Sequence, residues 1–448
     1  MRRRQFLQAA GAATLAGPLV GDVRATAQPA RPKIAAVFTE LRFRSHAFNI
    51  LENFFQPYLF RGALVEPGVE VVSFYADQFP KDDLARDAAR RLGVPLYPTI
   101  ETALGCGGER LAVDGVLVIG EHGDYPTNDL GQKLYPRKEF FDRAVAVMQR
   151  SGRYVPLFND KHWSYRADWA REMVGTARRR GFPVLAGSSV PLAERRPTFE
   201  LPPEARVDEI TCVHGGGFEV YDFHALECLQ SIVEGRRGGE TGLVRVEFLE
   251  REAALRAADE GRWSRELFDA AIAAERAAGF ERQSRPALGV RPEQLRDVDD
   301  RGTELRHVIL LTYRDGTRGV VAAAGSHSSR WNVALRLHGE SQPRALAYFN
   351  GPWGNRCLFK ALSHAAQRLF ISGREPYPAE RTLLTSVALD AAVHSRAARR
   401  PIEIAGPAIA YQAGDWSRFR EDGSSWRRIT ADVPQPATFD PGDAKLLR

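Results

Sequence analysis

The stretch Ile34-Ala35-Ala36-Val37-Phe38, which runs into Thr39-Glu40-Leu41-Arg42-Phe43-Arg44-Ser45-His46, sets the pattern of the first half of the chain. Five apolar residues in a row predict a buried strand, and the helical spacing of the apolar residues that follow predicts a helix over 46–59. The alternation continues, with strands expected at 69–75, 113–119, 154–158 and 183–185, and helices at 82–92, 99–104, 137–150 and 165–180. This alternation predicts a doubly wound parallel sheet with helices on both faces.

The second half of the chain has a different pattern, because strand-like runs now follow one another directly. They are expected at 209–213, 243–249, 307–313, 319–324, 333–338 and 345–349, with helices at 222–234, 264–278 and 380–396. This order predicts a mostly antiparallel open sheet with helices on one face. We place the boundary near residue 163. The prediction is therefore a Rossmann-like domain over 33–162, a second α/β domain over 163–405 and a tail over 406–448.

The first turn, between the strand at 34–38 and the next helix, contains no glycine. Parallel sheets of this kind commonly bind dinucleotides at that turn, where glycines let main-chain N–H groups approach the pyrophosphate. Here Thr39 opens the turn, and the bulky Arg42 and Arg44 occupy it. The chain therefore has a dinucleotide-binding frame with an altered phosphate turn, in which the two arginines either block a phosphate or bind it.

Length and composition narrow the kinds of protein that this chain can be. The chain has 448 residues, enough for two domains with separate cores, and its 26% of charged residues is ordinary for a globular protein. The net charge is +6, but the arginines are spread along the chain rather than gathered in a basic arm, so no nucleic-acid partner is expected. No stretch after the N-terminal leader approaches the ~18 unbroken apolar residues of a membrane span. The four cysteines are scattered without metal-binding spacing, and buried free thiols are expected.

The N-terminus has the pattern of an export signal. Arg2-Arg3-Arg4-Gln5-Phe6-Leu7 precedes an Ala/Gly-rich stretch over 9–20, and Ala25-Thr26-Ala27 supplies small residues for cleavage. The pair Arg3-Arg4 before Phe6-Leu7 resembles the twin-arginine signal. We expect cleavage after Ala27 and a periplasmic mature protein. The alternative is a disordered basic leader.

Three further segments, taken in order, carry a family resemblance. They are Phe74-Tyr75-Ala76-Asp77 through Ile100-Glu101-Thr102-Ala103-Leu104, then Tyr221-Asp222-Phe223-His224-Ala225-Leu226-Glu227, and Phe370-Ile371 through Gly373-Arg374, Pro376, Pro378 and Glu380 to Ala391-Ala392-Val393-His394-Ser395. With them, the region 33–405 resembles the glucose-fructose oxidoreductase/inositol dehydrogenase/rhizopine-catabolism (Gfo/Idh/MocA) superfamily of NAD(P)-dependent sugar dehydrogenases. The resemblance implies a homo-oligomeric oxidoreductase that acts on a hydroxyl group of a small sugar, cyclitol or glycoside.

Asp77 and Lys161 are the first candidate site residues. Asp77 follows the second strand, where a carboxylate accepts hydrogen bonds from a ribose 2′-hydroxyl and repels a 2′-phosphate, so NAD is favoured over NADP. Its alternative role is a helix N-cap or turn residue. Lys161, between Asp160 and His162, matches the lysine of the family's Glu-Lys-Pro tripeptide, and the resemblance gives it contact with cofactor and substrate. An exposed lysine at a strand end is the alternative.

The segment from Asp222 to Glu227 is the second candidate, and the resemblance makes it part of the catalytic region. His224 and Glu227 are three residues apart and share a face of the expected helix. Glu227 would fix the tautomer of the imidazole, whose other nitrogen takes the proton from a sugar hydroxyl. A histidine satisfied within the core is the alternative. His214 lies upstream, but without a clear third and fourth ligand no metal site is predicted.

Glu121 and His122 complete the candidates. They open the loop after the apolar strand at 113–119, and Asp124 follows them. Loops at the carboxyl ends of parallel strands form the ligand crevice of such sheets. This concentration of titratable groups predicts a site in contact with the cofactor. The alternative is a surface turn.

Two functions are consistent with these residues. The leading one is an NAD-dependent dehydrogenase in which Lys161 or His224 accepts the hydroxyl proton as hydride passes to the nicotinamide. The other keeps the fold but has lost the dinucleotide. It would be a non-redox lyase or hydrolase, or a sugar-binding protein, that uses Glu121, His122, Lys161 and His224.

Overall fold

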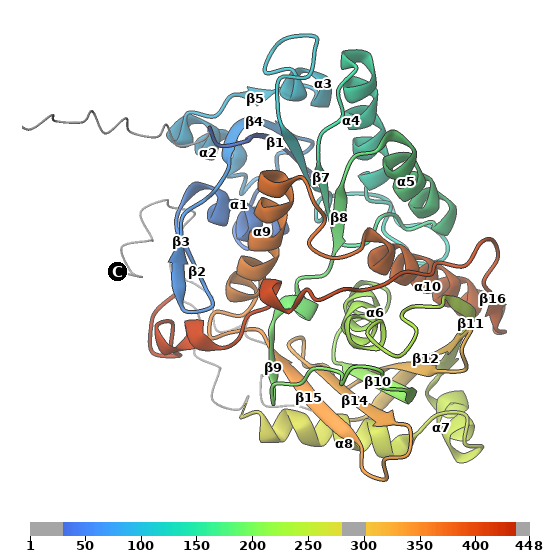
Figure 1. Ribbon diagram of the computed structural model, residues 1–448. Helices are drawn as coiled ribbons and strands as arrows, with labels where there is room; N and C mark the ends of the chain where they lie inside the picture. The colour runs from blue at the N-terminus through green and yellow to red at the C-terminus, as the bar shows by residue number, and fades with distance from the viewer. Residues whose placement is uncertain (1–29, 280–301, 436–448) are drawn as a thin grey trace, which may run out of the picture. The chain divides into compact units, whose positions relative to one another are not determined.

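The computed structural model describes residues 30–279 and 302–435 of the chain (Figure 1). The leader predicted over 1–27, with its cleavage site, lies outside these residues. Within the described ranges, no helix combines the length and the apolar character that a membrane crossing requires.

The first half of the described chain builds a six-stranded parallel sheet. Its strands lie in the order β5, β4, β1, β6, β7 and β8, with bounds Leu96–Tyr97, Glu70–Ala76, Lys33–Phe38, Gly115–Ile119, Leu157–Asp160 and Val184–Gly187. Neighbouring strands pair in parallel throughout. The order runs outward in both directions from β1 and β6, so the predicted doubly wound arrangement is confirmed. The strand order reverses between β1 and β6. This topology places a ligand crevice at the carboxyl ends of these two strands.

Side chains alternate between the two faces of β1, and each face has its own set of helices. Ala35 and Val37 share an apolar core with α3 (Ile100–Leu104), α4 (Arg137–Ser151), α5 (Ala167–Arg180) and α10 (Ala379–Ala398). Ile34, Ala36 and Phe38 share another with α1 (His46–Phe55), α2 (Ala85–Leu92) and α9 (Asn355–Ser372). The period of two is that of an extended strand. Figure 1 shows α9, from the C-terminal part of the chain, beside α1.

The close approach of α9 explains a glycine at the start of β6. A Cβ atom at Gly115 would lie 2.5 Å from Cδ1 of Phe370 and 2.8 Å from Cδ1 of Ile34, so a side chain would overlap both. The boundary predicted at residue 163 therefore falls inside this body. Both β8 and α9 lie beyond residue 163 and yet belong to the first sheet and its covering layer.

The helix predicted over 46–59 is shorter in the structure, because α1 ends at Phe55. Gln56 is extended, with φ −140° and ψ 157°, which is the conformation favoured before a proline, here Pro57. The chain then forms a hairpin of β2 (Tyr58–Phe60) and β3 (Ala63–Val65) before it enters β4.

The second sheet has eight strands. Their order is β16, β11, β12, β13, β10, β14, β15 and β9, with bounds Ile402–Glu403, Leu243–Glu250, Leu305–Tyr313, Arg318–Ala324, Val207–His214, Trp331–Leu337, Arg344–Phe349 and Glu194–Arg196. Among the described strands of this sheet, β10 and β13 are the parallel pair, and the other neighbours pair antiparallel. The predicted antiparallel character is confirmed.

Helices cover both faces of this second sheet. On one face, α6 (Val220–Val233) and α10 share a core with Ile210 and Val321. On the other, α7 (Arg251–Asp259) and α8 (Arg265–Ala277) share a core with Val213 and Val320. The open face expected from the sequence is therefore covered by α7 and α8. The strand periodicity shows two apolar faces, but which helix covers which face depends on long-range packing.

The described part of the predicted tail belongs to the fold. Trp416 and Phe419 lie in the core that contains α1 and α9, and Nε1 of Trp416 donates to Oε1 of Glu234 at 2.9 Å. The four cysteines are free thiols. Three are buried as predicted, whereas Cys106 is exposed.

Candidate active site

The loops that follow β1, β6 and β7 meet at the carboxyl edge of the parallel sheet. Thr39 follows β1, and its hydroxyl donates to the main-chain carbonyl of Glu121, which follows β6, at 2.7 Å. Lys161 follows β7, and its Nζ lies 3.1 Å from Oε1 of Glu121. All three residues are buried. Lys161 has the unusual φ of +65°, which bends the chain where the strand ends. The structure thus brings together three residues that the sequence assigns to the site.

Glu121 is the centre of a buried cluster of charges. Besides Lys161, Nη2 of Arg137 at the start of α4 contacts its second oxygen, Oε2. Burial disfavours ionisation, but the charges of Lys161 and Arg137 outweigh it and hold the pKa of Glu121 well below its usual value. Nη1 of Arg137 also donates to Nε2 of His162 at 3.1 Å. Burial and the charges of Arg137 and Lys161 hold the pKa of His162 well below its usual value, so the imidazole is neutral and can accept this hydrogen bond.

Glu219 adds a carboxyl group that titrates near neutrality. It is the N-cap residue of α6, with φ +68°, and its Oε1 lies 3.6 Å from Nε2 of His162. Burial raises the pKa of Glu219 to about 7, with the charge of Glu121 acting in the same direction and that of Lys161 against it. A carboxyl group with such a pKa can both donate and accept a proton at neutral pH, as a general acid or base must.

Two histidines lie beside this cluster. Nδ1 of His46, at the start of α1, is 2.6 Å from Oδ2 of Asp160, the residue before Lys161. The main-chain N–H of His46 donates to Nδ1 of His122 at 3.3 Å. Burial, with the neighbouring His46, lowers the pKa of His122 to about 4, so this imidazole is neutral at physiological pH. Asp160 therefore orients His46 rather than Lys161.

His224 is linked to Glu227 through a serine rather than directly. Its Nδ1 lies 2.6 Å from Oγ of Ser188, and the main-chain N–H of Ser188 donates to Oε2 of Glu227 at 3.3 Å. The other oxygen of Glu227 accepts from Oγ1 of Thr385 at 2.6 Å. Burial and the charge of Lys161 hold the pKa of His224 well below its usual value. Glu227 thus positions the serine that holds the imidazole.

Asp222 belongs to a different group of side chains. Its Oδ1 is 3.0 Å from Nε2 of His214 and 2.8 Å from Nε2 of His307, and its Oδ2 accepts the main-chain N–H of Glu219 at 2.8 Å. Burial disfavours ionisation of Asp222, but the two imidazoles outweigh it and its pKa is lowered. The structure therefore places Asp222, which was predicted as catalytic, in contact with these two histidines rather than with Lys161 or His224.

The predicted ribose acceptor, Asp77, already binds two hydroxyl groups of the chain itself. The hydroxyl of Tyr75 donates to Oδ1 at 2.7 Å, and the hydroxyl of Tyr125 donates to Oδ2 at 2.6 Å. Gln78 holds the loop that carries Tyr125, since it exchanges hydrogen bonds of 2.8 and 3.1 Å with the main chain of Asp124. A ribose diol would make the same hydroxyl–carboxylate bonds. Asp77 therefore fits the ribose end of NAD, provided that Tyr125 leaves.

In the first turn, a side chain already binds two of the main-chain N–H groups. Oγ of Ser45, the N-cap of α1, accepts from the N–H groups of Arg42 and Phe48 at 3.3 and 3.2 Å. The side chain of Arg42 also pairs with Glu40, and Arg44, with φ +63°, donates to Gln435. The turn also provides the side-chain charge of the two arginines for a phosphate, and Arg42 is 41% exposed. The residues fit the ribose of NAD and provide guanidinium groups, not a glycine cradle, for its phosphates.

Sequence reasoning missed several members of the cluster. These are His46, Arg137, Ser188 and Glu219, and of His162 it noted only the position. A signal for Glu219 existed in Gly215-Gly216-Gly217, because a run of glycines marks a close approach of the backbone. A Cβ atom at Gly216 would lie 1.8 Å from the ring of Tyr221. The other residues come from separate elements, and no local pattern joins them.

Comparisons with known proteins give similarities among solved structures. No protein-family model and no curated protein matches the chain. Among solved structures, it is similar to GenD2 from gentamicin A biosynthesis in complex with NAD, with 13% identity, coverage of 84% of this chain and 97% of that one, and a TM-score of 0.49. It is also similar to a scyllo-inositol dehydrogenase from Lactobacillus casei (10% identity, 84% and 99% coverage, TM-score 0.49) and a myo-inositol dehydrogenase from Corynebacterium glutamicum (12%, 84% and 100%, TM-score 0.47). At these identities and TM-scores below 0.5, the similarities do not assign a substrate or a cofactor.

Proposed function

We propose that this chain is an oxidoreductase that moves hydride between NAD and a hydroxyl-bearing carbon of a sugar or cyclitol. The observation that carries the proposal is the buried Lys161–Glu121 pair, 3.1 Å apart, at the carboxyl ends of β7 and β6. In a doubly wound sheet this edge is the ligand crevice. A cluster of charged and titratable side chains buried there is costly to fold, which supports a catalytic use.

The residues of the chain supply the proton chemistry of such a reaction. Glu219, with its pKa of about 7, accepts the hydroxyl proton when it is ionised. Lys161, held by Glu121, donates a hydrogen bond to the substrate oxygen. His224, the other base predicted from the sequence, is neutral and is held through Nδ1 by Ser188, so that Nε2 is the nitrogen that would contact a hydroxyl. These roles extend the predicted pair of Lys161 and His224 by Glu219.

The dinucleotide would supply the hydride acceptor. Asp77 would hold its adenosine ribose, and this carboxylate disfavours the extra phosphate of NADP. Arg42 and Arg44 would bind the phosphates through their side chains. Thr39 would support the cofactor site indirectly, because its hydroxyl binds the main-chain carbonyl of Glu121 and so joins the loops after β1 and β6.

Calorimetry with the full chain tests this proposal. The wild-type protein should bind NAD⁺ or NADH, and Asp77→Asn should weaken binding by about tenfold or more, because one charge-assisted hydrogen bond contributes about 1.5–3 kcal/mol. Asp87→Asn is the matched control, since Asp87 is an exposed carboxylate that pairs with Arg90 and Arg91. Native purification followed by mass spectrometry of released molecules should yield a dinucleotide. No dinucleotide in that extract, together with no binding of NAD(H) or NADP(H), would overturn the redox function.

A non-redox function on the same fold is the second candidate. It is favoured by the filled state of Asp77, both of whose oxygens bind tyrosine hydroxyls, and by the satisfied N–H groups around Ser45. In that case Lys161, Glu121 and Glu219 would transfer protons on a carbohydrate without a dinucleotide, as in a lyase or hydrolase, or would only bind it. Lys161→Met separates these possibilities: lost turnover with retained sugar binding indicates an enzyme, and unchanged behaviour indicates a binding protein.

Export by the twin-arginine route and self-association complete the proposal. The motif Arg3-Arg4 before Phe6-Leu7 supports periplasmic export with cleavage after Ala27. Mass spectrometry of the mature protein should give an N-terminus at Gln28. Light scattering of the purified protein should give a homo-oligomer, and a monomer at micromolar concentration would contradict that part of the proposal.

A further inference from the structure

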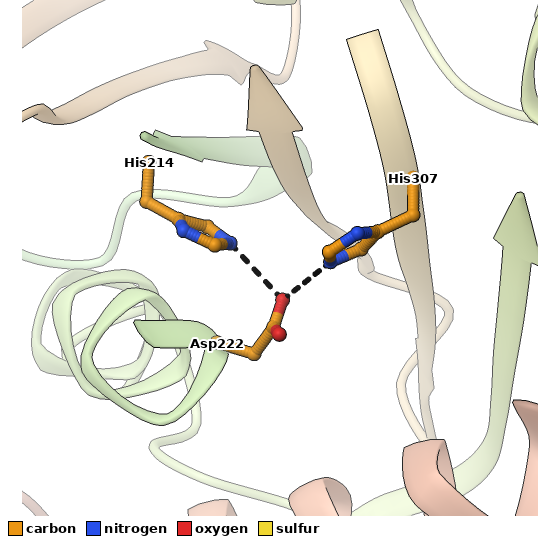
Figure 2. A group of neighbouring side chains, drawn as sticks. All are labelled: His214, Asp222 and His307. Atoms are coloured by element: carbon orange, nitrogen blue, oxygen red, sulfur yellow. Dashed lines mark hydrogen bonds and ion pairs between the residues drawn. The ribbon is translucent and has the colours of Figure 1, made fainter. Parts of the chain in front are cut away.

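Three side chains from β10, α6 and β12 converge on one point (Figure 2). His214 ends β10, Asp222 lies in the first turn of α6, and His307 lies in β12. Both imidazoles direct Nε2 at the same carboxylate oxygen, Oδ1 of Asp222, at 3.0 and 2.8 Å. All three side chains are buried, with exposed fractions of 0, 0 and 7%.

Two imidazoles and a carboxylate are the donor set of many divalent transition-metal sites. The three donor atoms all lie within 4.8 Å of one another. In tetrahedral zinc sites with bonds of about 2.0–2.1 Å, the ligand atoms are roughly 3.3–3.4 Å apart. Small side-chain rotations would therefore separate the imidazole nitrogens and the carboxylate oxygen enough to bind the ion between them. We propose that His214, Asp222 and His307 bind a first-row divalent transition-metal ion such as Zn²⁺.

The surroundings hold these ligands in place, as metal sites require of their neighbours. Oδ2 of Asp222 accepts the main-chain N–H of Glu219 at 2.8 Å, which fixes the carboxylate and leaves Oδ1 directed at the imidazoles. The ring of His214 is parallel to within 17° of Trp331, and the ring of His307 packs 4.9 Å from that of Phe248. Nδ1 of His214 is buried without a hydrogen-bond partner in the described part of the chain. The polar contact of this imidazole is therefore made by Nε2, which faces Asp222.

A cavity lies against one of the three ligands, His307. It has a volume of about 230 Å³ and is lined by His307 together with Phe218, Glu250, Arg306, Arg396 and neighbouring residues. Three protein ligands beside an open space are typical of a metal site that keeps a fourth position for water or substrate. The same three ligands join β10, β12 and the first turn of α6. Because Glu219 caps that turn and its N–H binds Asp222, the ion would also help to fix the position of Glu219.

Metal binding to the full-length protein tests the proposal. After removal of metal with a chelator, the wild-type protein should bind one equivalent of Zn²⁺ by calorimetry, and Co²⁺ should give the visible absorption of a four- or five-coordinate site. His307→Gln should weaken Zn²⁺ binding by at least about tenfold, since even an outer partner of a metal ligand is worth 10–100-fold. His338→Gln is the matched control, because His338 also pairs with a carboxylate, that of Asp208 at 3.1 Å, but is exposed.

Three outcomes would overturn the proposal. One is that the folded, metal-free wild type takes up no Zn²⁺ and no Co²⁺. Another is that His307→Gln and His338→Gln bind Zn²⁺ with the affinity of the wild type. If His307→Gln does not fold, the wild-type protein decides the question, because a rise in its unfolding temperature on addition of Zn²⁺ is expected and no rise contradicts the site.

Discussion

Replacing Glu121 with glutamine removes the carboxylate that Lys161 and Arg137 both contact. The three side chains are only 5, 4 and 1% exposed, so water cannot compensate for the lost charge. Removing one partner of a buried ion pair costs about 3–5 kcal/mol, because a charge stays buried without its counterion. We expect Glu121→Gln to lower the free energy of unfolding by about that amount.

Urea unfolding at pH 7, followed by tryptophan fluorescence, measures this loss. Glu266→Gln is the control, since Glu266 pairs with Arg336 at 2.6 Å but is 57% exposed, and a surface pair contributes about 0–1 kcal/mol. A loss for Glu121→Gln that is no larger than for Glu266→Gln would refute a desolvated cluster at the sheet edge.

The same variant tests how the free energy of unfolding depends on pH. The pKa of Glu121 is lower in the folded than in the unfolded protein, so the folded state binds fewer protons and its stability falls as the pH is lowered. The stability that ionised Glu121 contributes is fully present above its unfolded pKa of about 4.3 and is lost as the pH falls below that value. The difference in stability between the wild type and Glu121→Gln should therefore narrow below about pH 4. Removing the charge of Glu121 should also lower the pKa of Glu219 and move an activity profile toward acid pH.

Three other predictions concern Glu219, Tyr125 and the first core. The pKa of Glu219 rises from 4.5 to about 7 on folding, so the free energy of unfolding should fall by about 3 kcal/mol between these pH values, and Glu219→Gln should flatten that part of the curve. Tyr125→Phe removes the hydroxyl that NAD must displace from Asp77, so calorimetry should show NAD⁺ binding tightened by about 3–10-fold, and weaker binding would contradict the overlap of the two sites. Phe74→Ala, in the buried core, should cost about 3–5 kcal/mol in urea unfolding. Phe79→Ala, at a ring that is 38% exposed, should cost less than about 1 kcal/mol, and equal losses would contradict the packing of β4.

Local patterns predicted the two sheets but not what packs across them. The strand at 34–38 and the apolar run at 113–119 are buried on both faces, as their composition indicates. The helix α9 was missed, although Leu358, Leu362, Ala365 and Leu369 recur at helical spacing. Even a correct helix assignment would not have placed α9 against β1, because that contact joins segments about three hundred residues apart.

In the candidate site, too, local patterns predicted some residues, whereas those that depend on long-range packing were missed. Glu121 was predicted because it follows a parallel strand, and such strand ends form the ligand crevice. Lys161 was predicted from its match to the lysine of the family's Glu-Lys-Pro tripeptide. Glu219 was missed because its pKa comes from burial among groups on other elements, which no spacing reveals. His307, which contacts Asp222, was missed for a similar reason. The two residues are 85 positions apart and meet only when α6 packs on the second sheet.

The packing of α9 on the first sheet also sets the order in which the chain can fold during synthesis. Until residues 355–372 have left the ribosome, the face of β1 that carries Ile34, Ala36 and Phe38 lacks part of its cover. An N-terminal fragment such as 33–162 would therefore expose apolar surface and tend to aggregate. If the protein is exported in a folded state, its leader emerges first but the body becomes transportable only near the end of translation. In that case, readiness for export would depend on completion of α9.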